Sequence, residues 1–427
     1  MKITKLSLIA ALAVTTAMAG DAKISGDAKL YYGTDDSGTN DFFEQGGSIG
    51  DVALNLDYSR EVGNGVTLNF GIAGISTLGL ENELVSGTWI THGTKTTVPV
   101  LDATGAATGD TAGTTGNPVG DAVWIDTANI VVNMGKTTAV VGRQTLDTPF
   151  FKTETWNIAQ NTFDAAVLVN SNVPDTTLVG AWVGRGNGTA GSTVNLNNDN
   201  LGGNHHGFGG DHPAYAVGAI NKSIPLTTVQ AWGYRIPKVA TAYWTQADIA
   251  ATKEISVGLQ YAAAELNAGS ANVDTSAYAT QIAYNAGKLS TSVAYSKRDN
   301  KEGGIDIANI ATGHTQGSES SLYTESYWNL GFVGAQGAEA VGAKVAYDLG
   351  AAQVALQGTN SHASQSEVVD ATVPVASQVH YNDLQEVAAT VSTKVGPLNV
   401  DLAYINAHID NARTDTALVM LTAPFSL

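Results

Sequence analysis

The segment DVALNLDYS, residues 51–59, decides the fold because apolar residues stand at positions 52, 54, 56 and 58 and mostly polar ones between them. Successive side chains of a β-strand point to opposite faces, so this segment predicts a strand with one apolar and one largely polar face. The same alternation runs through residues 23–32 and 398–405. A soluble β-sandwich has this period as well, so alternation alone leaves soluble and membrane folds open.

The spacing of these segments favours the membrane fold. Strand-like segments of about 10 residues come in pairs joined by very short turns, and longer polar loops separate the pairs, as in transmembrane strands of about 9–11 residues. We therefore predict an all-β protein, a transmembrane antiparallel up-and-down β-barrel, with the short turns periplasmic and the long loops outside. The long loops are predicted at 35–48, 76–121, 186–212, 299–339 and 360–383.

The pattern predicts about 18 strands, and 16 is the alternative if 163–170 or the pair flanking 236–238 does not form strands. The last predicted strand alternates up to Phe425 and Leu427. Outer-membrane barrels usually finish on such a strand, although an ordinary buried edge strand has the same pattern. The predicted strands are 23–33, 49–59, 65–75, 123–133, 137–145, 163–170, 176–185, 214–222, 226–235, 239–248, 253–265, 276–285, 288–298, 340–347, 351–360, 384–394, 397–408 and 415–427.

The first 19 residues predict export. Lys2 and Lys5 precede an apolar run at 6–14, and the segment ends in Ala17-Met18-Ala19. This is the pattern of a secretory signal peptide cleaved after Ala19. The apolar run is shorter than the roughly 20 residues that a membrane-spanning helix needs. We expect residues 20–427 to form a single outer-membrane β-barrel domain.

Composition excludes several classes of function. Without the two signal lysines, 19 basic residues face 39 acidic ones, a balance of −20 that disfavours binding to a nucleic-acid backbone. There is no cysteine, and the catalytic motifs of serine hydrolases, zinc proteases and nucleotide-binding loops are absent. Charged residues make up 14% of the chain, well below the roughly 25% of ordinary soluble domains. We therefore expect a protein that is not an enzyme and requires no cofactor.

Closure of 18 strands implies a water-filled lumen. In lipid every backbone N–H and C=O must be paired internally, so the sheet must close on itself, and a barrel of this size leaves an aqueous channel. The polar faces of the strands would line that channel. Selectivity then needs a constriction, which channels build from inward loops and rings of charge. We predict a porin for passive diffusion of ions and small hydrophilic solutes.

The segment 142–150, GRQTLDTPF, is followed by about 12 loop residues and then by TFDAA at 162–166. This motif resembles the OprD-like porins, most of all the Campylobacter-type major outer membrane porins, over about 30 residues, and the general layout agrees along the whole chain. The resemblance implies an 18-strand pore in each chain, a homotrimer, and a third loop folded into the lumen. Some members of the family bind calcium near the constriction.

The resemblance also implies a ladder of basic residues on the barrel wall facing acidic residues on the constriction loop. Arg143 lies within the shared motif, whereas the other arginines are chosen only by their phase and their place near the outer ends of strands. An arginine that reaches the membrane interface or pairs with a loop acid is the alternative. Net charge and loop carboxylates favour a weak preference for cations. The candidate constriction and selectivity residues are Arg143, Asp147, Lys152, Glu154, Asp164, Arg185, Arg235 and Arg298.

Two metal sites are conceivable from residue type. Carboxylates that converge in a narrow lumen could bind Ca²⁺, and Asp126, Asp147 and Glu154 are the candidate ligands, with ordinary loop salt bridges as the alternative. His205, His206 and His212 form a histidine-rich run that can bind transition metals, but a solvated surface loop explains it as well.

Other functions remain open from the sequence. The long loops 76–121 and 299–339 could make the barrel a surface adhesin or antigen, alone or together with a channel. A barrel enzyme with an acid–base pair and a soluble secreted all-β protein are further alternatives. The permeant solute does not follow from the residues.

Overall fold

The structure is a computed structural model of the whole chain. It describes residues 22–80, 83–86, 95–101, 107–115, 122–156, 158–187, 205–209, 212–267, 273–312, 318–363, 383–410 and 412–427. The predicted signal peptide, residues 1–19, lies outside the described residues.

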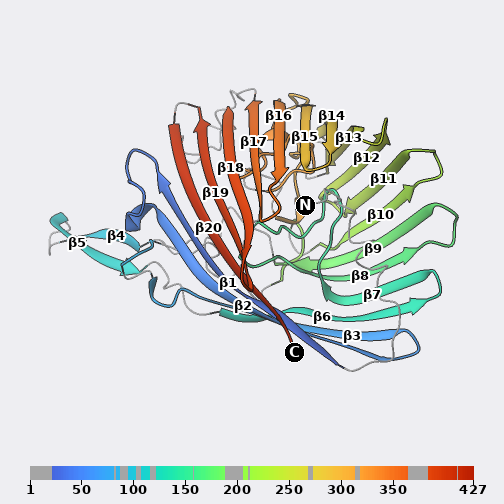
Figure 1. Cartoon of the computed structure of the whole chain (residues 1–427), viewed down its shortest axis with the longest axis horizontal. Helices are drawn as coiled ribbons and strands as arrows, with labels where there is room; N and C mark the ends of the chain where they lie inside the picture. Colours follow the sequence, from blue (N-terminus) through green and yellow to red (C-terminus); the bar gives the residue numbers. More distant parts are fainter. Residues whose placement is uncertain are drawn as a thin grey trace.

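One 18-stranded antiparallel sheet forms the body of the protein and closes on itself, because the last strand pairs with the first from Ser25–Ser426 to Asp36–Asp415. The strands follow each other round the ring in chain order (Figure 1). They are β1 (Lys23–Asp36), β2 (Ser48–Gly63), β3 (Val66–Ser76), β6 (Ala122–Met134), β7 (Thr137–Gln144), β8 (Phe163–Asn170), β9 (Thr176–Gly186), β10 (Ala214–Asn221), β11 (Thr227–Ile236), β12 (Ala240–Ala250), β13 (Ile255–Leu266), β14 (Val273–Ala286), β15 (Leu289–Arg298), β16 (Glu339–Asp348), β17 (Ala352–His362), β18 (Leu384–Val395), β19 (Leu398–Ile409) and β20 (Ala412–Ser426).

This topology confirms the predicted β-barrel and the count of 18 strands. Residues 163–170 form β8, and the two sides of 236–238 form β11 and β12, so the 16-strand alternative is wrong. One feature was not predicted. Within the predicted loop 76–121, β4 (Lys95–Leu101) and β5 (Ala107–Thr115) form a separate two-stranded sheet, drawn beside the barrel in Figure 1.

The two ends of the barrel differ in the length of their connections. At one end every hairpin turn has two to five residues, as between β2 and β3, where Asn64 and Gly65 have positive φ angles of 54° and 76°. That pair of angles belongs to the tight turn that matches strand twist and that Asn-Gly favours. At the other end most connections are longer, including 37–47, 77–121, 145–162 and 299–338. The predicted distribution of short turns and long loops is therefore present. No helix in the described part of the chain is long and apolar enough to cross a membrane.

The barrel wall has an apolar outer face. Large hydrophobic side chains of the strands stand exposed on it, among them Leu54, Leu56, Val293 and Leu356. Exposed apolar surface of this extent is stable only against lipid, because each such side chain would otherwise lose the free energy of burial. Exposed tyrosines and Trp182 on the same face fit the aromatic girdles of membrane barrels.

Neighbouring residues of β15 allow the two faces to be tested directly. Val293 is 58% exposed on the outer face, and Ser292 lies on the inner face. Val293→Arg is expected to destabilise the folded barrel by about 2–4 kcal/mol, because arginine at the middle of the lipid-facing wall must be desolvated. Ser292→Arg should lower the unfolding free energy much less, since a side chain on the inner face stays in contact with water. Urea unfolding in lipid vesicles measures both values, and equal costs would contradict the assigned faces.

Candidate functional site in the lumen

Loop 145–162 packs on the inner wall of the barrel. Phe150 meets the rings of Tyr234 on β11 and Trp244 on β12 edge to face, with ring centroids 5.5 and 5.8 Å away. All three side chains are almost completely buried. Tyr234 and Trp244 belong to the inward phase of their strands, because their sequence neighbours Arg235 and Tyr243 are exposed on the outer face. Aromatic contacts thus hold the start of the loop on this wall.

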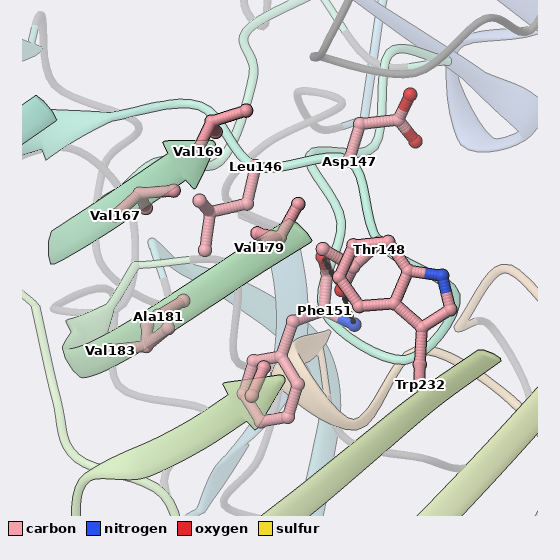
Figure 2. Close-up of a pocket in the computed structure, with 11 residues that line it drawn as sticks. Leu146, Asp147, Thr148, Phe151, Val167, Val169, Val179, Ala181, Val183 and Trp232 are labelled. Carbon is pink, nitrogen blue, oxygen red and sulfur yellow. Dashed lines mark hydrogen bonds between the residues drawn. The ribbon is translucent and has the colours of Figure 1, made fainter. Parts of the chain in front are cut away.

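The junction between loop and wall is tightly filled. Figure 2 shows Leu146 and Phe151 turned towards the side chains of β8 and β9, including Val167 and Val179, while the carboxylate of Asp147 turns away from them. The cavity left between them has a volume of only about 20 Å³, which is too small for an organic solute. The junction between loop and wall therefore offers no space for a solute.

The same loop also reaches the opposite wall. Ile158 is completely buried in a cluster that includes Tyr31 of β1, Ala53 of β2 and Trp124 of β6. Lys29 Nζ on β1 donates a hydrogen bond of 3.3 Å to the Ile158 carbonyl oxygen. Loop 145–162 thus contacts the β11–β12 wall through Phe150 and the β1–β6 wall through Ile158.

Loop 299–338 is a second segment that packs against inward-facing residues. Most of its described side chains from Ile305 to Thr312 and many from Ser318 to Ala338 are buried. Its strongest anchor is Glu386 on β18, which is buried and accepts hydrogen bonds from the backbone N–H groups of Tyr327, Trp328 and Asn329 at 2.7, 3.1 and 2.8 Å. A carboxylate that accepts several N–H donors forms strong, charge-assisted bonds.

A tyrosine adds a further anchor to the β12 wall. Tyr323 donates its phenolic hydrogen to Asp248 Oδ1 at 2.6 Å. Burial of the ring and the adjacent Asp248 carboxylate raise the pKa of Tyr323, because both disfavour a phenolate. The hydroxyl therefore stays protonated and remains a donor over the physiological pH range.

The two loops are joined to each other by charged side chains. Lys152 Nζ lies 2.9 Å from Glu319 Oε1, and Lys152 is only 6% exposed. Glu154 Oε1 accepts hydrogen bonds from Asn309 Nδ2, Thr312 Oγ1 and the Glu319 N–H at 2.9, 2.7 and 3.0 Å. The rings of Trp156 and Trp328 also meet edge to face. Lys152 and Glu154, predicted as selectivity residues, are thus used in the contact between the loops.

This contact makes a quantitative prediction. Lys152→Met and Glu319→Gln, alone and combined, form a double-mutant cycle of unfolding free energy. We expect a coupling energy of about 1–2 kcal/mol, since buried ion pairs in one network couple more strongly than distant sites. Lys297 and Glu339 form an exposed pair at 2.8 Å and provide the matched control. Exposed pairs contribute about 0–1 kcal/mol to stability. A coupling energy between Lys152 and Glu319 no larger than that of the control pair would contradict a stabilising buried ion pair between the two loops.

Three carboxylates gather on the inner face of β1, β2 and β6. A Cβ atom on Gly71 would lie 2.5 Å from Asp126 Oδ1 and 2.7 Å from Asp57 Oδ1, so these two oxygens are at most about 5 Å apart and repel one another. Gly71 leaves the space that both carboxylates occupy. Asp27 lies on the same wall, where it accepts a hydrogen bond from Asn55 and lies 3.8 Å from Lys29 Nζ. The acidic group therefore stands beside the point where Ile158 touches the wall.

Asp126 was the only one of these carboxylates among the sequence candidates. Asp57 is part of the alternating segment that decides the fold, but a single sequence does not show which inward residues of β1, β2 and β6 lie side by side. The strand register supplies that information, since it pairs Asp27 with Asn55 and places Gly71 opposite both Asp57 and Thr127.

The four arginines do not form the predicted inward ladder. Arg298 alone points inward, in phase with the buried Ala294 and Ser296, and it is buried against the carbonyl oxygens of Asp299 and Lys301. Arg235 is exposed on the outer face. The prediction relied on strand phase and strand end, and near the ends of the strands neither of them fixes the face that an arginine occupies.

Arg143, Asp164 and Arg185 come together, but on the outer face of the wall. In β7 and β8 the inward residues are Gln144, Phe163 and Ala165, which are buried, so Arg143 and its cross-strand partner Asp164 have the outward phase. Arg185 joins them through an ion pair with Asp164. This orientation differs from the predicted lumen-facing one.

The predicted calcium ligands are not brought together. Asp147 is exposed on loop 145–162, Glu154 is enclosed by hydrogen-bond donors, and Asp126 lies on the β6 wall. Among the residues that the structure describes, no group of three acidic or histidine side chains is placed to hold a metal ion, and this includes His205, His206 and His212. Asp211 of the histidine-rich run lies outside the described residues.

No protein-family model and no curated protein matches this sequence. Solved structures match over almost the full chain. OccK8 (OprE) of Pseudomonas aeruginosa has a TM-score of 0.69 at 12% identity and covers 95% of this chain and 98% of its own. Acinetobacter baumannii OccAB4 has a TM-score of 0.68 at 10% identity, covering 96% and 99%. P. aeruginosa OpdK, solved with vanillate, has a TM-score of 0.68 at 13% identity, covering 95% and 99%.

These likenesses agree with the closed sheet and its apolar outer wall, which together make the chain a multi-pass protein of a bacterial outer membrane. The OprD-like architecture predicted from the segment 142–150 is confirmed as a fold, and the Campylobacter-type subtype stays a prediction. The protein has the fold of the OprD/Occ outer-membrane porins of Pseudomonas and Acinetobacter.

Proposed function

We propose that the protein is a diffusion channel for ions and small hydrophilic solutes, narrowed by loops 145–162 and 299–338 inside the barrel. The observation that carries this proposal is that loop 145–162 contacts opposite walls, through Phe150 on Trp244 and through Ile158 on Lys29. A loop held at both sides divides the ring and leaves a narrowed passage, as channels require for selectivity. The neighbours with the same fold, one of them solved with vanillate, support small solutes as the class that passes.

A preference for cations follows from the acidic wall. Asp27, Asp57 and Asp126 gather where Ile158 of loop 145–162 meets β1, and Lys29 is the cation beside them. Three carboxylates and one ammonium group leave a negative local charge, which attracts cations and repels anions in a narrow passage. Asp147, exposed on the same loop, would add to this field.

Swelling of proteoliposomes tests the proposed function. Purified protein in vesicles should admit pentoses and hexoses and exclude larger oligosaccharides, so that the swelling rate falls steeply with solute size. Vesicles without protein provide the baseline. A rate equal to that baseline for every solute, with barrel insertion verified by protease protection, would contradict a diffusion channel.

A surface-binding function is a second candidate, and the structure favours loop 77–121 for it over loop 299–338. The hairpin β4–β5 in residues 77–121 forms its own sheet outside the barrel wall, which suits a segment that meets a partner. Loop 299–338 is a poor candidate because most of its described side chains are buried. Replacing 87–116 with a short linker should abolish attachment to host or phage receptors while solute flux is retained. Unchanged attachment would remove this candidate. The homotrimer implied by the family resemblance stays a prediction.

A further inference from the structure

A groove of about 430 Å³ lies between β6, β7, β8 and β9 towards the ends that carry the longer loops. Its lining combines two arginines with apolar groups that face outwards, among them Trp182 and Val141, which are 46% and 56% exposed. An outward groove in a membrane barrel is bathed by lipid and not by the lumen. The proposed channel makes no use of it.

The two arginines share one carboxylate. Arg143 donates from Nε and Nη2 to the two oxygens of Asp164 at 2.8 and 3.2 Å, and from Nη1 to the Ile125 carbonyl oxygen at 2.8 Å. Arg185 Nη2 donates to Asp164 Oδ2 at 2.7 Å, and its side chain is 57% exposed. Within the part of the chain that the structure describes, two guanidinium groups face one carboxylate, so this cluster carries one net positive charge, mainly on Arg185.

A β-bulge turns Arg185 to this face. The register between β8 and β9 shifts so that Asp164 pairs with Arg185 while Ala165 pairs with Val183, which leaves Gly184 unpaired. Strict alternation from the inward Val183 would have pointed Arg185 into the lumen. Bulges re-aim side chains and are features of sites rather than defects. A Cβ on Gly184 would lie 2.7 Å from the Trp182 ring, so glycine is also what lets that ring lie beside the groove.

We propose that this groove binds a phosphate group of a phosphorylated glycolipid in the outer leaflet. Guanidinium groups bind phosphate oxygens through paired, charge-assisted hydrogen bonds. The longer loops mark the outer end of the barrel, so the groove stands at the depth of the lipid headgroups. The apolar outer wall continues from Val141 and Leu168 towards the membrane interior, where acyl chains would lie. Trp182 has the amphipathic ring that membrane interfaces favour.

Lipid binding by the purified barrel tests this site. Native mass spectrometry or fluorescence titration in detergent is run with diphosphorylated lipid A, with lipid A stripped of phosphate, and with inorganic phosphate alone. The wild-type protein should bind the diphosphorylated lipid at least tenfold more tightly than the stripped lipid, a difference of about 1.4 kcal/mol. Arg185→Gln should remove most of that difference, and Arg185→Lys should restore only part of it. Inorganic phosphate should compete only at millimolar concentration.

The control is Lys297→Gln, which removes an exposed outer-face cation that Glu339 already neutralises. This variant should bind lipid A like the wild-type protein. Arg185 is exposed at a bulge, so the variant should still fold, and its heat-modifiable migration in electrophoresis verifies this. Equal affinity for both lipids, or equal loss in Arg185→Gln and Lys297→Gln, would overturn the proposal. If Arg185→Gln dissociates an oligomer while lipid affinity is unchanged, the groove is an interface between copies and the lipid site is wrong.

Discussion

Replacing Glu386 by alanine is expected to raise the single-channel conductance by roughly twofold or more, because the loop that narrows the passage loses its main anchor. The Glu386 carboxylate accepts backbone hydrogen bonds from Tyr327, Trp328 and Asn329 and one from the Asn329 side chain. Removing it leaves several partly buried N–H donors without their acceptor, which costs about 1–3 kcal/mol for a fully buried group and less for a partly exposed one. Loop 299–338 should then leave the β18 wall for at least part of the time.

The conductance of Glu386→Ala is compared with that of Glu339→Ala in planar bilayers. Glu339 is an exposed carboxylate at the start of β16 whose side chain bonds Tyr295 and Lys297 of β15, so its loss should leave the conductance unchanged. Heat-modifiable migration shows whether each variant folds. A folded Glu386→Ala variant with wild-type conductance and wild-type protection of residues 318–335 from proteolysis would contradict the anchoring role.

Neutralising Asp57 and Asp126 together is expected to reduce the cation preference by roughly half or more, because the field of a narrow passage depends on fixed charges within a few ångströms. Their carboxylate oxygens flank Gly71 on the wall that Ile158 approaches. Asn keeps the size of Asp, so the combined Asp57→Asn and Asp126→Asn variant should fold. It also relieves the repulsion between the two carboxylates, so its unfolding free energy should not fall.

Reversal potentials in asymmetric potassium chloride measure this effect. Asp175→Asn makes the same substitution once, at the turn between β8 and β9, where Asp175 has a φ of 53° that Asn also tolerates. This variant should keep the wild-type reversal potential. A double variant whose reversal potential equals that of Asp175→Asn would show that Asp57 and Asp126 do not set the selectivity.

Much of the fold could be predicted because a barrel strand carries its own signal. Residues 51–59 show the period of two, and Asn64-Gly65 marks the next turn, so β2 and β3 follow from local sequence alone. The hairpin β4–β5 could not be predicted in this way. It lies in a Thr-, Gly- and Ala-rich stretch where no regular alternation of apolar and polar residues distinguishes strand from loop.

The site was less predictable because it depends on which face of the wall each residue occupies and on contacts between residues far apart in the sequence. Arg185 stands near the outer end of its strand as predicted, but the bulge at Gly184 turns it outward, and no local pattern marks that bulge. Lys152 and Glu154 have the residue types of a selectivity loop. Their partners Asn309, Thr312 and Glu319 lie more than 150 positions away, in a loop that the sequence predicts to be exposed. The burial of loop 299–338 and its contact with loop 145–162 therefore follow only from the folded chain.

The measurement that tests the central claim most directly is planar-bilayer recording of the purified wild-type protein, with the reversal potential taken in asymmetric potassium chloride. The account predicts discrete conductance steps and a reversal potential on the cation-selective side. Folded, heat-modifiable protein that inserts but gives no steps would contradict a channel, and steps with an anion-selective reversal potential would contradict the acidic wall of Asp27, Asp57 and Asp126 as the selectivity element.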